Sequence, residues 1–432
     1  MSSEKSDYEI GVDLLRQGTD LAEAGQLEKA LAKLTQATHW LPDEVDAWRM
    51  RGMVEGAMEE FQAAEVSFQK AAALDPKSPD LRYLLATVHM QLNQIELSVE
   101  EFQKLIAEQP DFLPAYFDCG TALQLLGHYQ EAIEIFERRQ ALEPDFDTCL
   151  MCAMTYEMLG DYEHSEKYYA EAVKLDPENT MVIENHGTAC LELERYDDAL
   201  VDFNRSLELD PDSSDALCGR GRVYLAQENL NAAKADLERA VRLDPDNVFA
   251  WHALGTTHFE LEEHTESLEC FDTALELAPD LLCYDMRAAS RRILGDLEGS
   301  LHETELGLDE DPNDTMVLQE RGETLHALER FEEARDTFSK ILEMDSESID
   351  ALTWRGFTLM DLLEYPHAIA DFTRAIALDP KYAVAFLFRA NAYYQMENND
   401  KALADIRTAK KLAEKEKNED LIERCDLFLK EM

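Results

Sequence analysis

One pattern of apolar and polar positions, about 34 residues long, recurs along the chain. In residues 214–247 it shows most clearly. Apolar and small side chains recur every three or four residues over 215–227 and again over 230–243, which predicts two short amphipathic helices. Asp244 and Pro245 follow the second helix, and proline ends a helix because it has no amide proton to donate. The pattern therefore predicts a pair of helices that packs on copies of itself.

The spacing of the prolines sets the register of this repeat. Ten of the thirteen prolines fall in one register between Pro42 and Pro380, at spacings of 34 or 33 residues, and Ser346 stands where one is missing. The repeats are expected to begin near residues 11, 45, 79, 113, 146, 180, 214, 248, 281, 315, 349 and 383. This register predicts an N-terminal tail at 1–10, an array of about twelve repeats at 11–412 and a last helix at 413–432.

Small residues mark two positions of every repeat. Position eight holds only Gly or Ala, position twenty only Ala or Ser, and position 24 is mostly aromatic, as in Phe68 and Phe136. Glycine inside a helix costs about 1 kcal/mol relative to alanine, so its recurrence needs a reason. Close contact between the two helices of a pair supplies that reason.

These positions resemble the tetratricopeptide repeat. Its pattern appears in the second repeat as Trp48, Gly52, Ala64, Phe68, Ala71 and Pro76, and in the eighth as Trp251, Leu254, Gly255, Phe271, Ala274 and Pro279. The resemblance implies an all-α fold, an α-solenoid in which antiparallel helix pairs form a right-handed superhelix. It also implies that the first helices line a concave groove that holds peptides or partner proteins.

Two regions depart from the pattern. The ninth repeat has Thr304 and Gly307 in place of Phe and Ala, and the tenth has Ser346 in place of proline, so a softer joint is expected there. The last helix has an apolar side and is expected to cap the array, with docking onto a partner as the alternative. That side consists of Leu421, Ile422, Cys425, Leu427, Phe428 and Leu429.

Charge narrows the range of partners. The chain has 91 acidic and 40 basic residues, a net charge of −51. Such a chain repels nucleic acid and anionic membranes, so the expected partner is a protein or peptide of basic or apolar character. We see no signal peptide and no membrane-spanning stretch. The eight scattered cysteines favour reduced thiols in a cytoplasmic protein.

No catalytic pattern emerges from the sequence. Cys149 and Cys152 form one C-x-x-C motif, but both fall on core-facing positions and are expected to be structural. The histidines show no paired spacing typical of zinc, and no phosphate-binding glycine loop is present. We therefore predict no metal site, no cofactor and no enzymatic activity.

Position seven, where the family usually has leucine, is arginine in six repeats. In four of them an acid follows sixteen residues later, and His186 has Asp202 in the same relation. We expect ion pairs between the two helices of a repeat, with a ligand carboxylate held by the arginines as the alternative. The predicted pairs are Arg220 with Asp236, Arg287 with Glu303, Arg355 with Asp371, and Arg389 with Asp405.

Positions two, five, six and nine of the first helices are expected to line the groove. They place two apolar stretches on either side of a polar one, unless these side chains pack against neighbouring helices instead. The predicted binding residues are Met50, Met53, Tyr83, Leu84, Phe117, Leu150, Met151, Met154, Arg222, Trp354, Phe357 and Phe388.

The sequence thus predicts a non-catalytic scaffold that binds a peptide or protein segment in its groove. A regulatory or substrate-recruiting subunit of an enzyme complex, using the same surface, is the alternative.

Overall fold

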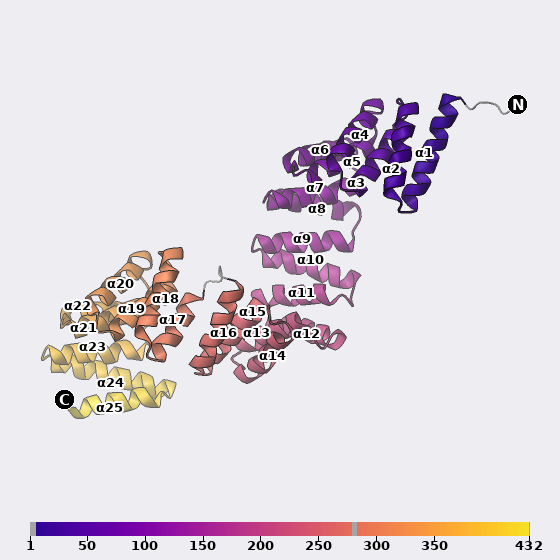
Figure 1. Ribbon diagram of the computed structural model, residues 1–432. Coiled ribbons are helices and arrows are strands. Elements are labelled where there is room, and N and C mark those ends of the chain that lie inside the picture. Colours follow the sequence, from indigo (N-terminus) through magenta and orange to yellow (C-terminus); the bar gives the residue numbers. More distant parts are fainter. Residues whose placement is uncertain (1–5, 279–282, 432) are drawn as a thin grey trace. The chain divides into compact units, whose positions relative to one another are not determined.

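The computed structural model describes residues 6–278 and 283–431, and within them the chain is all helix and turn. Twenty-five helices are present and no strand occurs among these residues (Figure 1). None of the helices in the described ranges is long and apolar enough to cross a membrane. The chain divides into two compact halves, an N-terminal half at 1–211 and a C-terminal half at 212–432.

The N-terminal half contains twelve helices among its described residues. They are α1 (Asp7–Glu23), α2 (Leu27–Trp40), α3 (Val45–Ala57), α4 (Phe61–Leu74), α5 (Pro79–Gln91), α6 (Ile95–Glu108), α7 (Leu113–Leu125), α8 (Tyr129–Leu142), α9 (Phe146–Met158), α10 (Tyr162–Leu175), α11 (Thr180–Glu192) and α12 (Tyr196–Leu209).

The C-terminal half contains thirteen helices in the part of it that is described. They are α13 (Ser214–Ala226), α14 (Leu230–Leu243), α15 (Val248–Glu260), α16 (His264–Leu277), α17 (Tyr284–Ile293), α18 (Leu297–Glu310), α19 (Thr315–Ala327), α20 (Phe331–Met344), α21 (Ile349–Asp361), α22 (Tyr365–Leu378), α23 (Ala383–Gln395), α24 (Asn399–Glu416) and α25 (Glu419–Glu431).

Consecutive helices pack as antiparallel pairs, α1 with α2 and so on to α23 with α24, and within each half every pair packs on the next. Short polar side chains begin many of the first helices. Ser78, Asn247 and Ser348 each accept a hydrogen bond from a backbone amide in the first turn of the helix that follows. The fold is therefore an all-α solenoid of helix pairs.

A glycine in the first helix makes room for a ring from the second. A Cβ atom on Gly120 would lie 2.4 Å from Cε1 of Phe136, and one on Gly52 would lie 2.7 Å from Cε1 of Phe68. Both rings are almost fully buried. The aromatic ring thus occupies the space left by the missing side chain.

The turn inside each pair contains one residue with positive φ. Four repeats place glycine there, including Gly127 at φ +74°. Others place a residue with a side chain, such as Glu194 at +57° and Leu363 at +62°, which costs roughly 1 kcal/mol each. The packing of the pair outweighs this local strain.

The ends of the array differ from the predicted boundaries. Helix α1 begins at Asp7 instead of residue 11, because Ser6 and Glu9 form a capping box. Helix α24 continues to Glu416, and α25 then packs Leu421 and Cys425 into the core of the last pair.

The expected softer joint falls within the C-terminal half. There the Thr304 hydroxyl donates to the Leu301 carbonyl at 2.8 Å, and the Ser346 carbonyl accepts from Arg374 at 2.7 Å. Pro279 and the predicted start of the ninth repeat at Leu281 lie outside the described residues.

Two glycines of helix α3 allow a matched test of the close contact. Gly52→Ala should lower stability by about 1–3 kcal/mol, because the new methyl group overlaps the Phe68 ring. Gly56→Ala should leave stability unchanged or raise it by up to about 1 kcal/mol, because its added Cβ would meet no atom within 4 Å apart from the adjacent backbone of its own helix. Urea midpoints and hydrogen exchange of α3 and α4 measure both effects. Equal destabilisation by the two substitutions would contradict this account.

Candidate functional site

The predicted groove residues of the N-terminal half differ in exposure. Met53 and Met154 are each 42% exposed. The other predicted residues there are half-buried: Met50, Tyr83, Leu84, Phe117, Leu150 and Met151. Phe117 packs on the ring of Phe136, with centroids 6.1 Å apart, and so belongs partly to the core. The surface therefore combines exposed methionines with aromatic side chains that pack against the core.

A cavity of about 600 Å³ opens among the helices α7, α9, α10 and α11. Its apolar lining comes from Leu125 on α7 and from Met151, Met154 and Met158 on α9. Its polar lining is Thr121, Gln124, Glu157, Tyr169 and Asn185. Most of the lining thus comes from first helices, the ones expected to face the groove.

The polar groups of this cavity are already held by neighbours. The Tyr169 hydroxyl donates to Glu157 at 2.8 Å, and Gln124 donates to Thr155 at 2.6 Å. Thr121 donates to the carbonyl of Phe117 at 3.0 Å. The walls are therefore fixed in place, while the methionine side chains keep their conformational freedom.

Two of the most exposed cavity residues were not predicted from the sequence. Leu125 is 65% exposed and Met158 is 58% exposed, and both occupy position thirteen of a first helix. Position thirteen lies one helical turn beyond position nine, so the same stripe continues onto it. Extending the helical spacing by that turn would have included both residues.

In the C-terminal half, the predicted aromatic residues lie together on α21 and α23. The rings of Trp354 and Phe357 are 5.9 Å apart between centroids, and those of Phe357 and Phe388 are 5.0 Å apart. The centroid of the His326 ring lies 4.9 Å from that of Phe357. All three predicted residues are half-buried, because each ring covers its neighbour.

A polar cluster lies on the first helices α17 and α19. Arg292 bonds Glu320 at 3.0 Å and Glu323 at 2.9 Å. Burial raises the pKa of Glu320 to about 7, and the charge of Arg292 only partly offsets it. Arg222, the predicted binding residue on α13, is also half-buried. A carboxyl group whose pKa is close to neutral pH thus lies in the polar stretch of the first helices.

The four predicted ion pairs each join the two helices of one pair. The shortest N–O distance in each is 2.6 Å for Arg220 with Asp236 and for Arg287 with Glu303, and 2.7 Å for Arg355 with Asp371 and for Arg389 with Asp405. Three of the four are bidentate, with the Nε and Nη2 atoms of the arginine bonding both carboxylate oxygens. Bidentate geometry makes these contacts specific as well as strong.

The arginines also reach the preceding pair of helices. Arg355 donates from Nη1 to Ser339 at 3.2 Å, and Arg389 donates from Nη1 to Thr373 at 3.0 Å. Arg287 bonds Asp272 at 2.6 Å. The guanidinium groups of Arg287, Arg355 and Arg389 thus each join three helices, which disfavours a role in holding a ligand carboxylate.

His186 occupies position seven of its repeat, where other repeats have arginine. Its Nδ1 atom lies 2.6 Å from Asp202. Burial lowers the pKa of His186, but the hydrogen bonds with Asp202 and Cys190 outweigh burial and raise the pKa to about 10. At neutral pH this imidazole is therefore positively charged and takes the place of the guanidinium.

All eight cysteines are buried and free. Burial raises the pKa of Cys119 to about 12 and that of Cys149 to about 11. Burial raises the pKa of Cys152 as well. A protonated, buried thiol is a poor nucleophile, so the C-x-x-C pair has the properties of core residues.

Three sequence profiles match parts of the chain. Residues 149–278 match the Cilia and flagella-associated protein 70 middle TPR-like domain. Residues 57–123 match one tetratricopeptide repeat profile, and residues 15–79 and 357–417 match another.

Related proteins share the repeat over part of their length. Tetratricopeptide repeat protein 37 of Xenopus laevis is 26% identical over 161 residues, 34% of this chain and 10% of that protein. Anaphase-promoting complex subunit 3 of Schizosaccharomyces pombe is 24% identical, over 38% of this chain and 25% of that protein. The Peroxisomal targeting signal receptor of Saccharomyces cerevisiae is 21% identical, over 46% and 33%. The chain thus spans a third or less of these relatives.

One solved structure is similar over almost the whole chain. The crystal structure of the APC/C hetero-tetramer Cut9-Hcn1 has a TM-score of 0.51 and 14% identity, and the match covers 96% of each chain. At this identity the likeness shows the fold alone.

Removing one partner of an interhelical ion pair should destabilise the repeat. Asp371→Ala removes both carboxylate acceptors of Arg355 and leaves its bond to Ser339, in a site where the aspartate side chain is 6% exposed. We expect a loss of about 2–3 kcal/mol, below the cost for a fully buried pair because Arg355 is 21% exposed. Hydrogen exchange of α21 and α22 measures it. Glu333→Ala, which breaks the exposed pair with Arg330, is the control and should cause no measurable change.

Glu320 should make stability depend on pH. Its pKa in the folded state, about 7, lies above its ordinary value of 4.5. Ionisation therefore costs more in the folded state, and stability falls as pH rises from about 4.5 to 7. Glu320→Gln removes this term and should raise stability at pH 8 by about 2 kcal/mol, with Arg292 still bonded to Glu323. Thermal melts of both proteins from about pH 5 to about pH 8, on either side of the pKa of about 7, test this pH dependence. A stability difference that does not grow with pH would refute the assignment.

Proposed function

We propose that this chain, a tetratricopeptide repeat protein and thus a protein-interaction scaffold, binds an extended segment of a partner protein across α7, α9 and α11. An apolar side chain of that segment enters the cavity beside Met154. The cavity is the observation on which the proposal depends. Its volume of about 600 Å³ lies within the range of ligand pockets, roughly 300–1,000 Å³.

Exposed apolar side chains in one place support this assignment. Leu125, Met154 and Met158 are 65%, 42% and 58% exposed, and all three line the same cavity. Exposed apolar side chains gathered around one hollow commonly mark a binding site. Methionine side chains suit partners of varied shape because they are unbranched and polarizable.

The net charge of the chain favours basic residues next to the apolar anchor. A net charge of −51 attracts cationic segments and speeds their encounter with the groove. The preferred partner segment therefore has one or more lysine or arginine residues flanking a leucine, methionine or phenylalanine.

The proposed role is non-catalytic. The names of two relatives, an Anaphase-promoting complex subunit and a Peroxisomal targeting signal receptor, support the second possibility, a subunit that recruits a substrate to a complex. Both roles use the same groove. They differ in whether the bound segment belongs to a permanent partner or to a molecule that is released after modification.

Peptides selected from a random phage-displayed library provide the probe. Peptides that bind the full chain should contain an apolar anchor, and Met154→Asp with Met158→Asp should weaken them at least about tenfold, because a charge in the cavity must be desolvated. Fluorescence polarisation of the labelled peptides measures affinity, and circular dichroism checks the fold. Both methionines are exposed, so the double variant is expected to fold.

Val201→Asp is the matched control. Val201 lies on the second helix α12, is 68% exposed and is not part of the cavity. This substitution should leave peptide affinity unchanged. If the double methionine variant binds every selected peptide as well as the unaltered chain, the groove assignment is wrong. Binding that does not weaken with added salt would refute the basic flanks.

A further inference from the structure

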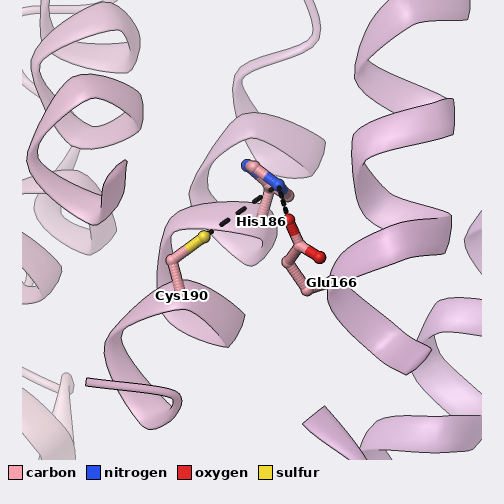
Figure 2. A group of neighbouring side chains, drawn as sticks. All are labelled: Glu166, His186 and Cys190. Atoms are coloured by element: carbon pink, nitrogen blue, oxygen red, sulfur yellow. Dashed lines mark hydrogen bonds and ion pairs between the residues drawn. The ribbon is translucent and has the colours of Figure 1, made fainter. Parts of the chain in front are cut away.

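Three side chains of types that can bind a metal ion, a carboxylate, an imidazole and a thiol, lie close together in the N-terminal half. Glu166 on α10 faces His186 and Cys190 on α11, and one ligand atom from each lies within 4.8 Å of the others (Figure 2). The Nε2 atom of His186 lies 3.4 Å from Glu166 Oε1 and 4.0 Å from Cys190 Sγ. Among the described residues, one group of three or more His, Cys, Asp or Glu side chains brings its ligand atoms this close together, and this is that group.

We propose that Glu166, His186 and Cys190 form a binding site for Zn²⁺. Zinc binds imidazole nitrogen, thiolate sulfur and carboxylate oxygen at about 2.0–2.3 Å, so neighbouring ligand atoms in its tetrahedron lie roughly 3.3–3.6 Å apart. The nitrogen–oxygen distance already falls in this range. The sulfur lies 4.0 Å from the nitrogen and within 4.8 Å of the carboxylate oxygen, so metal binding requires the Cys190 and Glu166 side chains to move together by roughly half to one ångström.

The helix geometry brings the nitrogen and the sulfur to one face. His186 and Cys190 are four residues apart on α11, so their side chains lie one turn from each other on the same side. Glu166 comes from the preceding helix pair and closes the site from the other side (Figure 2). Histidine spacing alone predicted no zinc site, and Glu166 lies twenty residues before His186, outside the usual motifs.

A carboxylate from a third helix fixes the histidine ring. Asp202 on α12 lies 2.6 Å from Nδ1 of His186, so Nε2 is the nitrogen that faces Glu166 and Cys190. A carboxylate on the far nitrogen of a zinc-binding histidine is common, because it orients the ring and makes it a stronger ligand. The second shell of the proposed site is thus already present.

The site is partly shielded from water. Cys190 is fully buried, and the side chains of His186 and Glu166 are 15% and 16% exposed. Arg195 also bonds Glu166, at 3.0 Å, but it has a second carboxylate partner in Asp198 at 2.7 Å. Arg195 can therefore leave Glu166 to the metal and keep one ion pair.

Binding replaces protons by the metal ion. The thiol of Cys190 and the imidazolium of His186 each release one proton to solvent, and the fourth tetrahedral position is left to a water molecule. In the ion-free protein the same residues form an ion-paired cluster like those at the arginine positions. The experiment therefore has to separate a metal site from a purely structural cluster.

Zinc titration of the full chain, with no affinity tag and after removal of metals by a chelator, tests the proposal. Excess Mg²⁺ is present to occupy exposed carboxylates. We expect one Zn²⁺ per chain in competition with a chromophoric chelator, and a rise in Tm on binding. Titration with Co²⁺ should produce a thiolate-to-cobalt charge-transfer band, which reports directly on the sulfur ligand.

Variants assign the site to these residues. Cys190→Ser should abolish the cobalt band and weaken zinc binding at least about tenfold, and Asp202→Asn should weaken it about 10–100-fold while the band remains. Cys270→Ser, at a buried thiol of the C-terminal half, is the control and should change neither.

Two results would overturn the proposal. One is the absence of stoichiometric zinc binding by the unaltered chain. The other is binding that persists unchanged in Cys190→Ser. If Cys190→Ser fails to fold, Glu166→Gln is tested in its place. Glutamine has almost the same shape as glutamate, and the Glu166 side chain is partly exposed, so this variant is expected to fold. Unchanged zinc affinity in Glu166→Gln would refute the site.

Discussion

The fold depends on a small residue, glycine or alanine, at one position of each first helix. Where that position is glycine, as at Gly120 and Gly356, the ring of the partner helix contacts the backbone directly. A methyl group there would overlap the ring, so the two helices would have to separate. The polar contacts between the helices depend on the same approach. The hydroxyl of Ser267 reaches the carbonyl of Gly255 at 2.9 Å because the two helices are this close.

The ion pairs are a consequence of that contact. Arg355 precedes Gly356 in its helix, and Asp371 precedes Phe372 in the next, so the charged pair lies beside the closest contact. The same relation holds for Arg220 and Asp236 beside Gly221 and its partner leucine. At this distance the guanidinium and the carboxylate can meet in bidentate geometry without extending either side chain. The interhelical contact therefore fixes the position of the charges, and the charges in turn favour one register of the two helices.

The sequence was sufficient for features set within one helix pair. The proline spacing located the helices, and the sixteen-residue separation indicated which arginine faces which acid, because both depend on local geometry. Features set by stacking between pairs were harder to predict. Phe117 packs partly into the core while Met154 stays exposed, although both were assigned to the groove by helical position alone. Glu166 was missed because its place beside His186 depends on packing between adjacent pairs, whereas Leu125 lies one turn beyond the positions considered in its own helix.

The contact made by position seven between the two helices of a repeat differs in chemistry between arginine and histidine. An arginine there stays protonated, and its long side chain reaches acceptors on both sides, as Arg389 reaches Asp405 and Thr373. Histidine is shorter and can lose its proton, so His186 keeps the contact with Asp202 but directs its other nitrogen toward Glu166. The orienting carboxylate of Asp202 occupies the position whose acid pairs with arginine in four other repeats. A single change of residue type, with Cys190 one turn away, is then enough to give the cluster a set of zinc ligands without altering how the helices pack.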